Sequence, residues 1–220
     1  AADLRQIEAS AADQPLMQRA GRAAADLAMA ICAERGTRVL ILAGPGNNGG
    51  DAFEAACLLR DRFFDTHVVF VGQAGNLPPD AAAAYRRFAD AGGVTTAEIP
   101  EHAQWSLIID GLFGIGLKRD VVDPYAHLVA EANTLAARDH CPLLALDCPS
   151  GLDADTGALH GQAIRASHTI TFLGSKPGLY TADGPDHCGE ISIATLDLDT
   201  GQLDVAAGRT VERDLFAGFL

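Results

Sequence analysis

The sequence predicts one three-layer α/β domain whose central sheet is mostly parallel. Short apolar runs alternate along the chain with longer segments of helical periodicity, which is typical of β–α units. The apolar runs are continuous rather than alternating with polar residues, as in strands that helices cover on both faces. The chain has 220 residues, enough for one such domain, and we expect residues 1–220 to form it.

The predicted elements follow one another in a regular order. The strands are expected at residues 39–43, 67–72, 105–110, 142–147, 169–173 and 190–196, with a short edge strand at 94–99. The helices are expected at residues 3–34, 50–62, 81–91 and 124–138. The first helix is an Ala-rich N-terminal extension. Its spacing predicts one apolar face, made of Leu16, Ala20, Ala23, Leu27 and Ile31.

Composition excludes several classes of protein. The net charge of −13 argues against nonspecific nucleic-acid binding, which depends on Lys and Arg. No apolar run approaches the roughly 20 residues of a membrane span, and no N-terminal segment has the order of a signal peptide. The five cysteines are scattered without a Cys-x-x-Cys pair, so we expect buried free thiols in a reducing cytoplasm.

The glycine-rich segment from Gly44 to Asp51 follows the first predicted strand. A strand that runs through such a loop into a helix exposes backbone N–H groups, which favour phosphate and other anions. The segment contains Gly-x-Gly-x-x-Gly, but the second strand ends at residues 70–72 without the acid that a dinucleotide fingerprint needs. It also lacks the Lys-Ser/Thr of a Walker loop. A dehydrogenase and a plain turn stay as alternatives to a loop that grips a nucleotide-like ligand.

Two further strands end in carboxylates, Asp110 and Asp147. Because ligands bind outside the carboxyl ends of parallel strands, the loops after these strands and the glycine segment are expected to meet in one crevice. Each aspartate could instead cap a helix or close a turn. Asn48, Asp110 and Ser150 together offer oxygen ligands with one formal charge, which suits a monovalent cation such as K⁺ better than Zn²⁺, Mg²⁺ or Ca²⁺.

Ser150 is a weak candidate nucleophile. Cys148 stands where a nucleophile elbow requires glycine, and no base is implied nearby. A serine hydrolase is therefore a minor alternative, and Ser150 fits a hydroxyl ligand or a cap better.

With these residues in place, the chain resembles the NAD(P)H-hydrate epimerase family, also known as the YjeF N-terminal domain. The matching pieces come in the family's order and span about residues 16–196. They are Leu16-Met-Gln-Arg-Ala-Gly21, Gly44-Pro-Gly-Asn-Asn-Gly-Gly-Asp51, Asp110-Gly-Leu-Phe-Gly-Ile-Gly116, Asp147-Cys-Pro-Ser-Gly-Leu-Asp153, Thr171-Phe-Leu-Gly-Ser-Lys-Pro-Gly178 and Gly189-Glu-Ile.

The resemblance implies a Rossmann-like three-layer fold, a homodimer and one K⁺ per subunit. It assigns K⁺ ligation to Asn48, Asp110 and Ser150, and catalysis to Asp147. The residues that it implies for substrate contact are Asn47, Asn48, Gly49, Gly50, Asp51, Gly114, Ile115, Gly116, Leu117, Lys118, Arg119, Asp120 and Asp147.

The resemblance also implies an isomerase of nicotinamide-cofactor repair. Such an enzyme interconverts the R and S epimers of hydrated NADH or NADPH at ring carbon C6, and the hydrate is substrate rather than cofactor. An ADP- or ATP-dependent dehydratase, fused or separate, is the expected partner, so the chain is either a stand-alone protein or a piece of a bifunctional one. A nonenzymatic binding module of the same fold is the alternative. The sequence leaves open whether Lys118 and Arg119 meet the 2′-phosphate of NADPH hydrate or only solvent.

Overall fold

The computed structural model describes residue 11 and residues 13–198. Within these residues, a single sheet has the strand order β3-β2-β1-β4-β5-β6-β7, and all neighbouring strands are parallel. The strands are β1 (Arg38–Ala43), β2 (Asp65–Phe70), β3 (Thr95–Thr96), β4 (Leu107–Gly111), β5 (Leu143–Leu146), β6 (His168–Phe172) and β7 (Glu190–Ala194). The predicted parallel sheet is confirmed, and each predicted strand overlaps an observed one.

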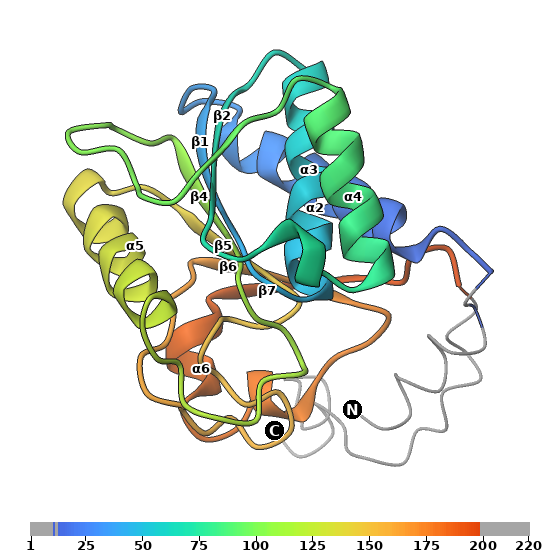
Figure 1. Cartoon of the computed structure of the whole chain (residues 1–220). Coiled ribbons are helices and arrows are strands. Elements are labelled where there is room, and N and C mark those ends of the chain that lie inside the picture. The colour runs from blue at the N-terminus through green and yellow to red at the C-terminus, as the bar shows by residue number, and fades with distance from the viewer. Residues whose placement is uncertain (1–10, 12, 199–220) are drawn as a thin grey trace.

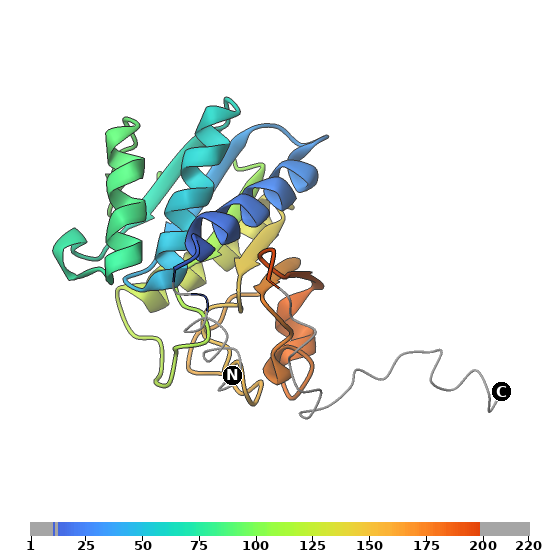
Figure 2. The same ribbon diagram turned by 90° about the vertical axis from the view of Figure 1, so that its right-hand side faces the viewer.

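Helices cover both faces of this sheet. One face carries α2 (Leu16–Cys32), α3 (Asn47–Asp61) and α4 (Pro79–Asp90), and the opposite face carries α5 (Tyr125–Asp139) (Figures 1 and 2). The remaining helical turns are η1 (Ala74–Asn76), η2 (Pro177–Leu179) and α6 (Gly184–Cys188). The fold is therefore the expected three-layer, Rossmann-like arrangement. None of the helices in the described part of the chain combines the length and hydropathy that crossing a bilayer requires.

The central strand β1 shows why the strands read as continuous apolar runs. Val39, Ile41 and Ala43 belong to the core under α2, α3 and α4. Leu40 and Leu42 belong to the second core, under α5. Because successive side chains of a strand point to opposite faces, a strand between two helical layers needs apolar residues at every position.

The Ala-rich helix α2 buries a face that is shifted from the predicted one, with Ala20 common to both. Ala20, Gly21, Ala24, Ala25, Ala28 and Cys32 are its buried residues. Leu16, Ala23, Leu27 and Ile31 are only partly buried against the same core. A Cβ on Gly21 would lie 2.2 Å from Cβ of Glu54, so α2 approaches α3 closely through its small residues. The predicted beginning of this helix, at residues 3–10, lies outside the described residues, and residues 13–15 precede the helix.

Helix α3 begins three residues before the predicted start, at Asn47 rather than Gly50. The prediction placed residues 47–49 in the loop before the helix, because glycine is a poor helix former. Asn47 and Asn48 therefore occupy the first helical turn, where backbone N–H groups have no partner within the helix. This shift brings the two amide side chains to the end of β1.

The strand order reverses between β1 and β4, since β1 connects towards β2 and the chain later returns to the other side of β1. The two loops that leave this point pack tightly: Gly44 N–H donates to the carbonyl of Gly111 at 3.0 Å. A Cβ on Gly44 would lie 1.7 Å from the carbonyl oxygen of Leu112, so only glycine fits there. Such a reversal is the place where open α/β sheets bind ligands.

We expect Phe53→Ala to lower the free energy of unfolding by about 3–5 kcal/mol, because it leaves a cavity in the larger core. Phe53 is fully buried and its ring packs against those of Phe70, Tyr85 and Phe88 at centroid distances of 5.5, 5.2 and 5.6 Å. Phe63→Ala is the matched control, since that ring is 92% exposed, and its effect should stay within ~0.5 kcal/mol. Urea unfolding measures both, and equal losses would contradict this account of the core.

Candidate functional site

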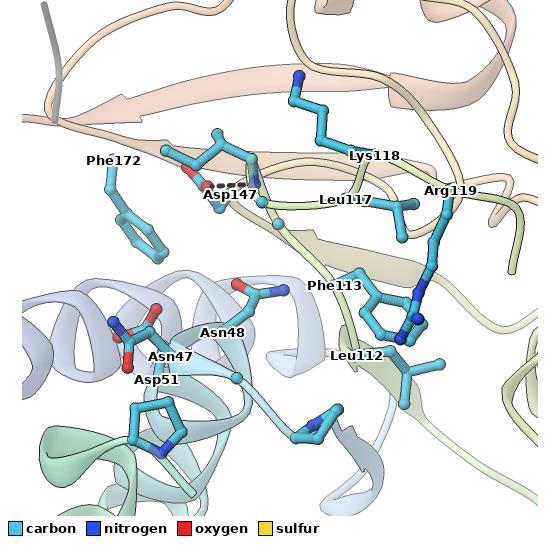
Figure 3. Close-up of a pocket in the computed structure, with 16 residues that line it drawn as sticks. Asn47, Asn48, Asp51, Leu112, Phe113, Leu117, Lys118, Arg119, Asp147 and Phe172 are labelled. Atoms are coloured by element: carbon cyan, nitrogen blue, oxygen red, sulfur yellow. Dashed lines mark hydrogen bonds between the residues drawn. The ribbon is translucent and has the colours of Figure 1, made fainter. Parts of the chain in front are cut away.

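A cavity of ≈ 590 Å³ lies outside the carboxyl ends of β1, β4 and β5, at the reversal of strand order (Figure 3). This volume is in the range of sites for small organic ligands. Its walls come from the β1–α3 turn, the loop after β4 and the ends of β5 and β6. The lining residues are Pro45, Gly46, Asn47, Asn48, Asp51, Pro78, Leu112, Phe113, Gly114, Ile115, Gly116, Leu117, Lys118, Arg119, Asp147 and Phe172.

The first turn of α3 forms one wall. Asn47, Asn48 and Asp51 line the cavity, as predicted for the glycine segment. Gly49 and Gly50 do not line it, because both face the protein. A Cβ on Gly49 would lie 2.0 Å from the carbonyl oxygen of Gly44, and one on Gly50 would lie 2.5 Å from the sulfur of Met17. These glycines therefore act through packing, which brings the helix N-terminus and its N–H groups to the cavity.

The carboxylate of Asp110 is completely buried and joins the loops after β4 and β5. Its Oδ1 accepts the N–H of Leu112 at 3.1 Å and the hydroxyl of Ser150 at 2.7 Å, and its Oδ2 accepts the N–H of Ser150 at 2.8 Å. Burial raises the pKa of Asp110 to about 6, although the hydrogen bonds from Ser150 and Leu112 oppose that rise. The predicted meeting of these two loops is therefore found in the structure.

Asn48 has an unusual environment. Its side chain is buried, and neither Oδ1 nor Nδ2 has a hydrogen-bond partner in the described part of the chain. Most buried polar atoms are paired, so an unpaired amide requires an explanation. Asn48 lies across Gly114 from Asp147: a Cβ on Gly114 would be 3.5 Å from Cγ of Asn48 and 2.9 Å from Oδ2 of Asp147. An amide without a partner among the described residues is thus placed beside the cavity.

Asp147 directly follows β5 and reaches the cavity from a left-handed backbone conformation, with φ +65°. This conformation is rare for a residue with a side chain, and such strain is concentrated at functional sites. The N–H of Ile115 donates to Oδ2 of Asp147 at 3.3 Å (Figure 3). The carboxylate therefore has a fixed position while its side chain stays 14% exposed.

Lys176 is a site residue that the sequence reasoning did not assign. It lies after β6, its side chain is 2% exposed, and its ammonium forms an ion pair with Oδ1 of Asp147. Thr171 Oγ1 and the carbonyl of Phe172 accept its other two hydrogen bonds, at 2.7 and 2.8 Å. The segment 171–178 was among the pieces that carried the resemblance, so its lysine was visible, but no pattern indicated that it reaches Asp147.

The loop after β4 forms the opposite wall, through residues 114–119. Lys118 points away from the centre of the cavity, and Arg119 extends in a different direction from it (Figure 3). The ammonium of Lys118 pairs with Asp153 at 3.4 Å and with Asp155 at 3.1 Å. Asp120, predicted as a substrate contact, does not line the cavity.

The contacts in the site limit which reactions its side chains can carry out. Ser150 is completely buried, and its hydroxyl is engaged by Asp110 and accepts the N–H of Phe113 at 2.9 Å, so it is not an available nucleophile. Asp147 is a carboxylate in the cavity wall that could exchange a proton with a ligand. The helix N-terminus offers donors to an anion, and Asp110 and Ser150 bring together oxygens that could take part in holding a cation. All five cysteines are free, four of them buried and Cys57 half-buried, largely as expected.

The chain is similar to a known protein family and to several of its members. The sequence model of the family described as YjeF-related protein N-terminus matches residues 13–178. A protein of Bordetella pertussis named NAD(P)H-hydrate epimerase is 42% identical over 197 residues, covering 88% of this chain and 84% of that protein. A protein of Achromobacter xylosoxidans with the same name is 44% identical over 182 residues, covering 82% and 85%.

Two further similarities concern architecture. A Coxiella burnetii protein named bifunctional NAD(P)H-hydrate repair enzyme Nnr is 35% identical, covering 87% of this chain but 38% of that longer protein. The crystal structure of the yeast protein ynu0 superposes with a TM-score of 0.65 at 19% identity, covering 81% of this chain and 76% of that one. The latter supports the fold.

We expect Gly49→Ala to destabilise the β1–α3 turn by about 1–3 kcal/mol, because its Cβ would meet the backbone of Gly44. This clash outweighs the ~1 kcal/mol that alanine gains over glycine inside a helix. Gly46→Ala is the control: nothing lies within 4 Å of its Cβ position. Thermal unfolding of the two variants measures the difference, and an unchanged Gly49→Ala protein would refute the close packing of this turn.

Proposed function

We propose that this protein, whose chain belongs to the family of YjeF-related protein N-termini, is an NAD(P)H-hydrate epimerase. Such an enzyme is an isomerase that interconverts the R and S epimers of hydrated NADH and NADPH. Two of its relatives, 42% and 44% identical over most of both chains, carry that name. The observation that carries the proposal is Asp147, a fixed carboxylate in a cavity that also presents a helix N-terminus.

The cavity suits a dinucleotide with a modified nicotinamide. The first turn of α3 offers N–H groups to the diphosphate. Phe113 and Phe172 give apolar walls that a ring can pack against. Lys118 is neutralised by Asp153 and Asp155, so Arg119 is the better candidate for the 2′-phosphate of NADPH hydrate.

The reaction requires a proton to move at the C6 hydroxyl of the substrate. The ring nitrogen beside C6 can donate its lone pair to form a C=N bond while the C6–O bond breaks and its electron pair leaves with oxygen. The carboxyl group of Asp147 protonates that oxygen, which departs as water, and the resulting carboxylate then takes a proton from water that adds to the opposite face. General acid–base catalysis of this kind contributes roughly 10²–10⁴-fold.

A K⁺ ion is the second part of the proposal. Asn48 Oδ1, the carboxylate of Asp110 and the hydroxyl of Ser150 would hold it. The support is chemical: the amide oxygen of Asn48 is buried and unpaired within the described chain, and Asp110 is a completely buried anion. A bound cation would offset the desolvation of that carboxylate.

We further propose a cytoplasmic homodimer that works with an ADP- or ATP-dependent dehydratase, which restores the cofactor from one epimer. The bifunctional name and greater length of the Coxiella relative support a dehydratase partner. The dimer and the location rest on the family resemblance alone.

The direct test is an epimerase assay. Purified R epimer of hydrated NADPH is incubated in K⁺ buffer, and formation of the S epimer is followed by chromatography after subtraction of the spontaneous rate. Acceleration is expected with the wild-type protein. No acceleration would reject the epimerase and favour a nonenzymatic binding module of the same fold.

Asp147→Asn should remove most of this acceleration, roughly 10²–10⁴-fold, because asparagine cannot exchange the proton. Circular dichroism should show an unchanged fold. Asp61→Asn is the control, since Asp61 is an exposed carboxylate at the opposite end of α3, and its activity should match wild type. Full activity in Asp147→Asn would exclude Asp147 as the acid–base group.

K⁺ should raise the thermal stability of the protein relative to Li⁺ or an organic cation at equal ionic strength. A ligand that binds only the folded state adds about 2.7 kcal/mol to the free energy of unfolding when its concentration is 100 times its Kd. Asn48→Ala should abolish this difference, whereas the exposed Asn76→Ala should keep it. Crystals soaked in Tl⁺ should show an anomalous peak between Asn48, Asp110 and Ser150. A stability that does not depend on the cation, with no such peak, would exclude the site.

A further inference from the structure

The buried ammonium of Lys176 needs a charge partner. Its side chain is only 2% exposed, and an isolated ammonium in such a place is costly. Asp147 is the carboxylate that contacts it within the described residues. The negative charge of Asp147 is therefore tied to the positive charge of Lys176.

The orientation of Lys176 is fixed by three acceptors. Besides Asp147, Thr171 Oγ1 accepts at 2.7 Å and the carbonyl of Phe172 at 2.8 Å. An ammonium has three N–H donors, so all of them are used. Lys176 also does not line the cavity. It can act on a substrate only through Asp147.

This arrangement makes the two oxygens of Asp147 unequal. Oδ1 is bound by Lys176 on the inner side. Within the described part of the chain, Oδ2 accepts the 3.3 Å hydrogen bond from Ile115 and no other, and it lies 2.9 Å from the position of a Cβ on Gly114, a residue of the cavity wall. Oδ2 is therefore the oxygen nearer the cavity wall at Gly114.

We infer that Lys176 is a positioning residue for the epimerase reaction: it anchors Oδ1 of Asp147, presents Oδ2 to the substrate and stabilises the carboxylate that remains when Asp147 has given up its proton. This inference rests on the proposed function. It differs from a purely structural role because it predicts a loss in turnover that depends on Asp147 and leaves substrate binding almost unchanged.

The test uses Lys176→Met, which keeps much of the side chain's length and removes its charge. We expect kcat to fall on the order of 10²-fold while KM changes less than ~3-fold, because Lys176 does not touch the substrate. Arg165→Met is the control: it removes one positive charge from an exposed residue just before β6, and kcat should stay at the wild-type value. Circular dichroism and thermal unfolding monitor the fold.

A double-mutant cycle separates positioning from general damage. If Lys176 acts through Asp147, Lys176→Met adds no further loss of kcat in the Asp147→Asn background. Should Lys176→Met fail to fold, Thr171→Val keeps the ammonium and removes one of its anchors, and kcat should fall by roughly 3–10-fold with KM unchanged.

The outcomes distinguish this inference from the proposed function. Wild-type acceleration together with full kcat in Lys176→Met would overturn the role of Lys176 and leave the epimerase standing. The role of Lys176 would also be overturned if Lys176→Met lowered kcat by the same factor in the wild-type protein and in the Asp147→Asn variant. A wild-type protein without acceleration would reject the epimerase itself.

Discussion

The site depends on the buried carboxylate of Asp110, at the end of β4. A charge in the middle of a parallel sheet is tolerated only when hydrogen bonds replace its lost hydration. Asp110 obtains them from the N–H of Leu112 and from both the N–H and the hydroxyl of Ser150. These bonds join the loops after β4 and β5, and the latter loop follows directly on Asp147. Removing any partner would leave an unpaired buried polar group, so the loops hold one another in place.

The backbones that leave β1 and β4 approach each other closely, and the cavity lies beside this contact. Gly44 leaves β1 against the carbonyl of Leu112, with no room for a Cβ, and Gly49 packs back on Gly44 in the same way. These contacts bring the N-terminus of α3 beside the loop after β4. Asn48 and Asp147 then lie on either side of Gly114, although they are almost a hundred positions apart in the sequence. Gly44 and Gly49, which do not line the cavity, thus determine which side chains meet there.

The sequence predicted the strands well and the details of the site less well, for physical reasons. A strand between two helical layers is apolar throughout, as in β1, so a local pattern identifies it. The start of α3 was placed three residues late because helix propensity disfavours Gly49 and Gly50, and tertiary packing overrode that preference. The buried face of α2 is shifted from the predicted one, which also included Leu16, Leu27 and Ile31, because close packing on α3 selects small side chains. The pairing of Lys176 with Asp147 joins loops after different strands, and no local pattern encodes it.

The combination of Asp147 and Lys176 is difficult to explain by stability alone. A left-handed backbone at a residue with a side chain stores strain, and a buried ion pair commonly stabilises a protein no more than apolar residues of similar size. Both features occur at one residue, and that residue faces the cavity. If the pair served only to hold β5 and β6 together, an apolar contact in a relaxed backbone would do so at lower cost. The arrangement is what the proposed acid–base role of Asp147 requires: a carboxylate that is held in a single orientation and remains stable when it is charged.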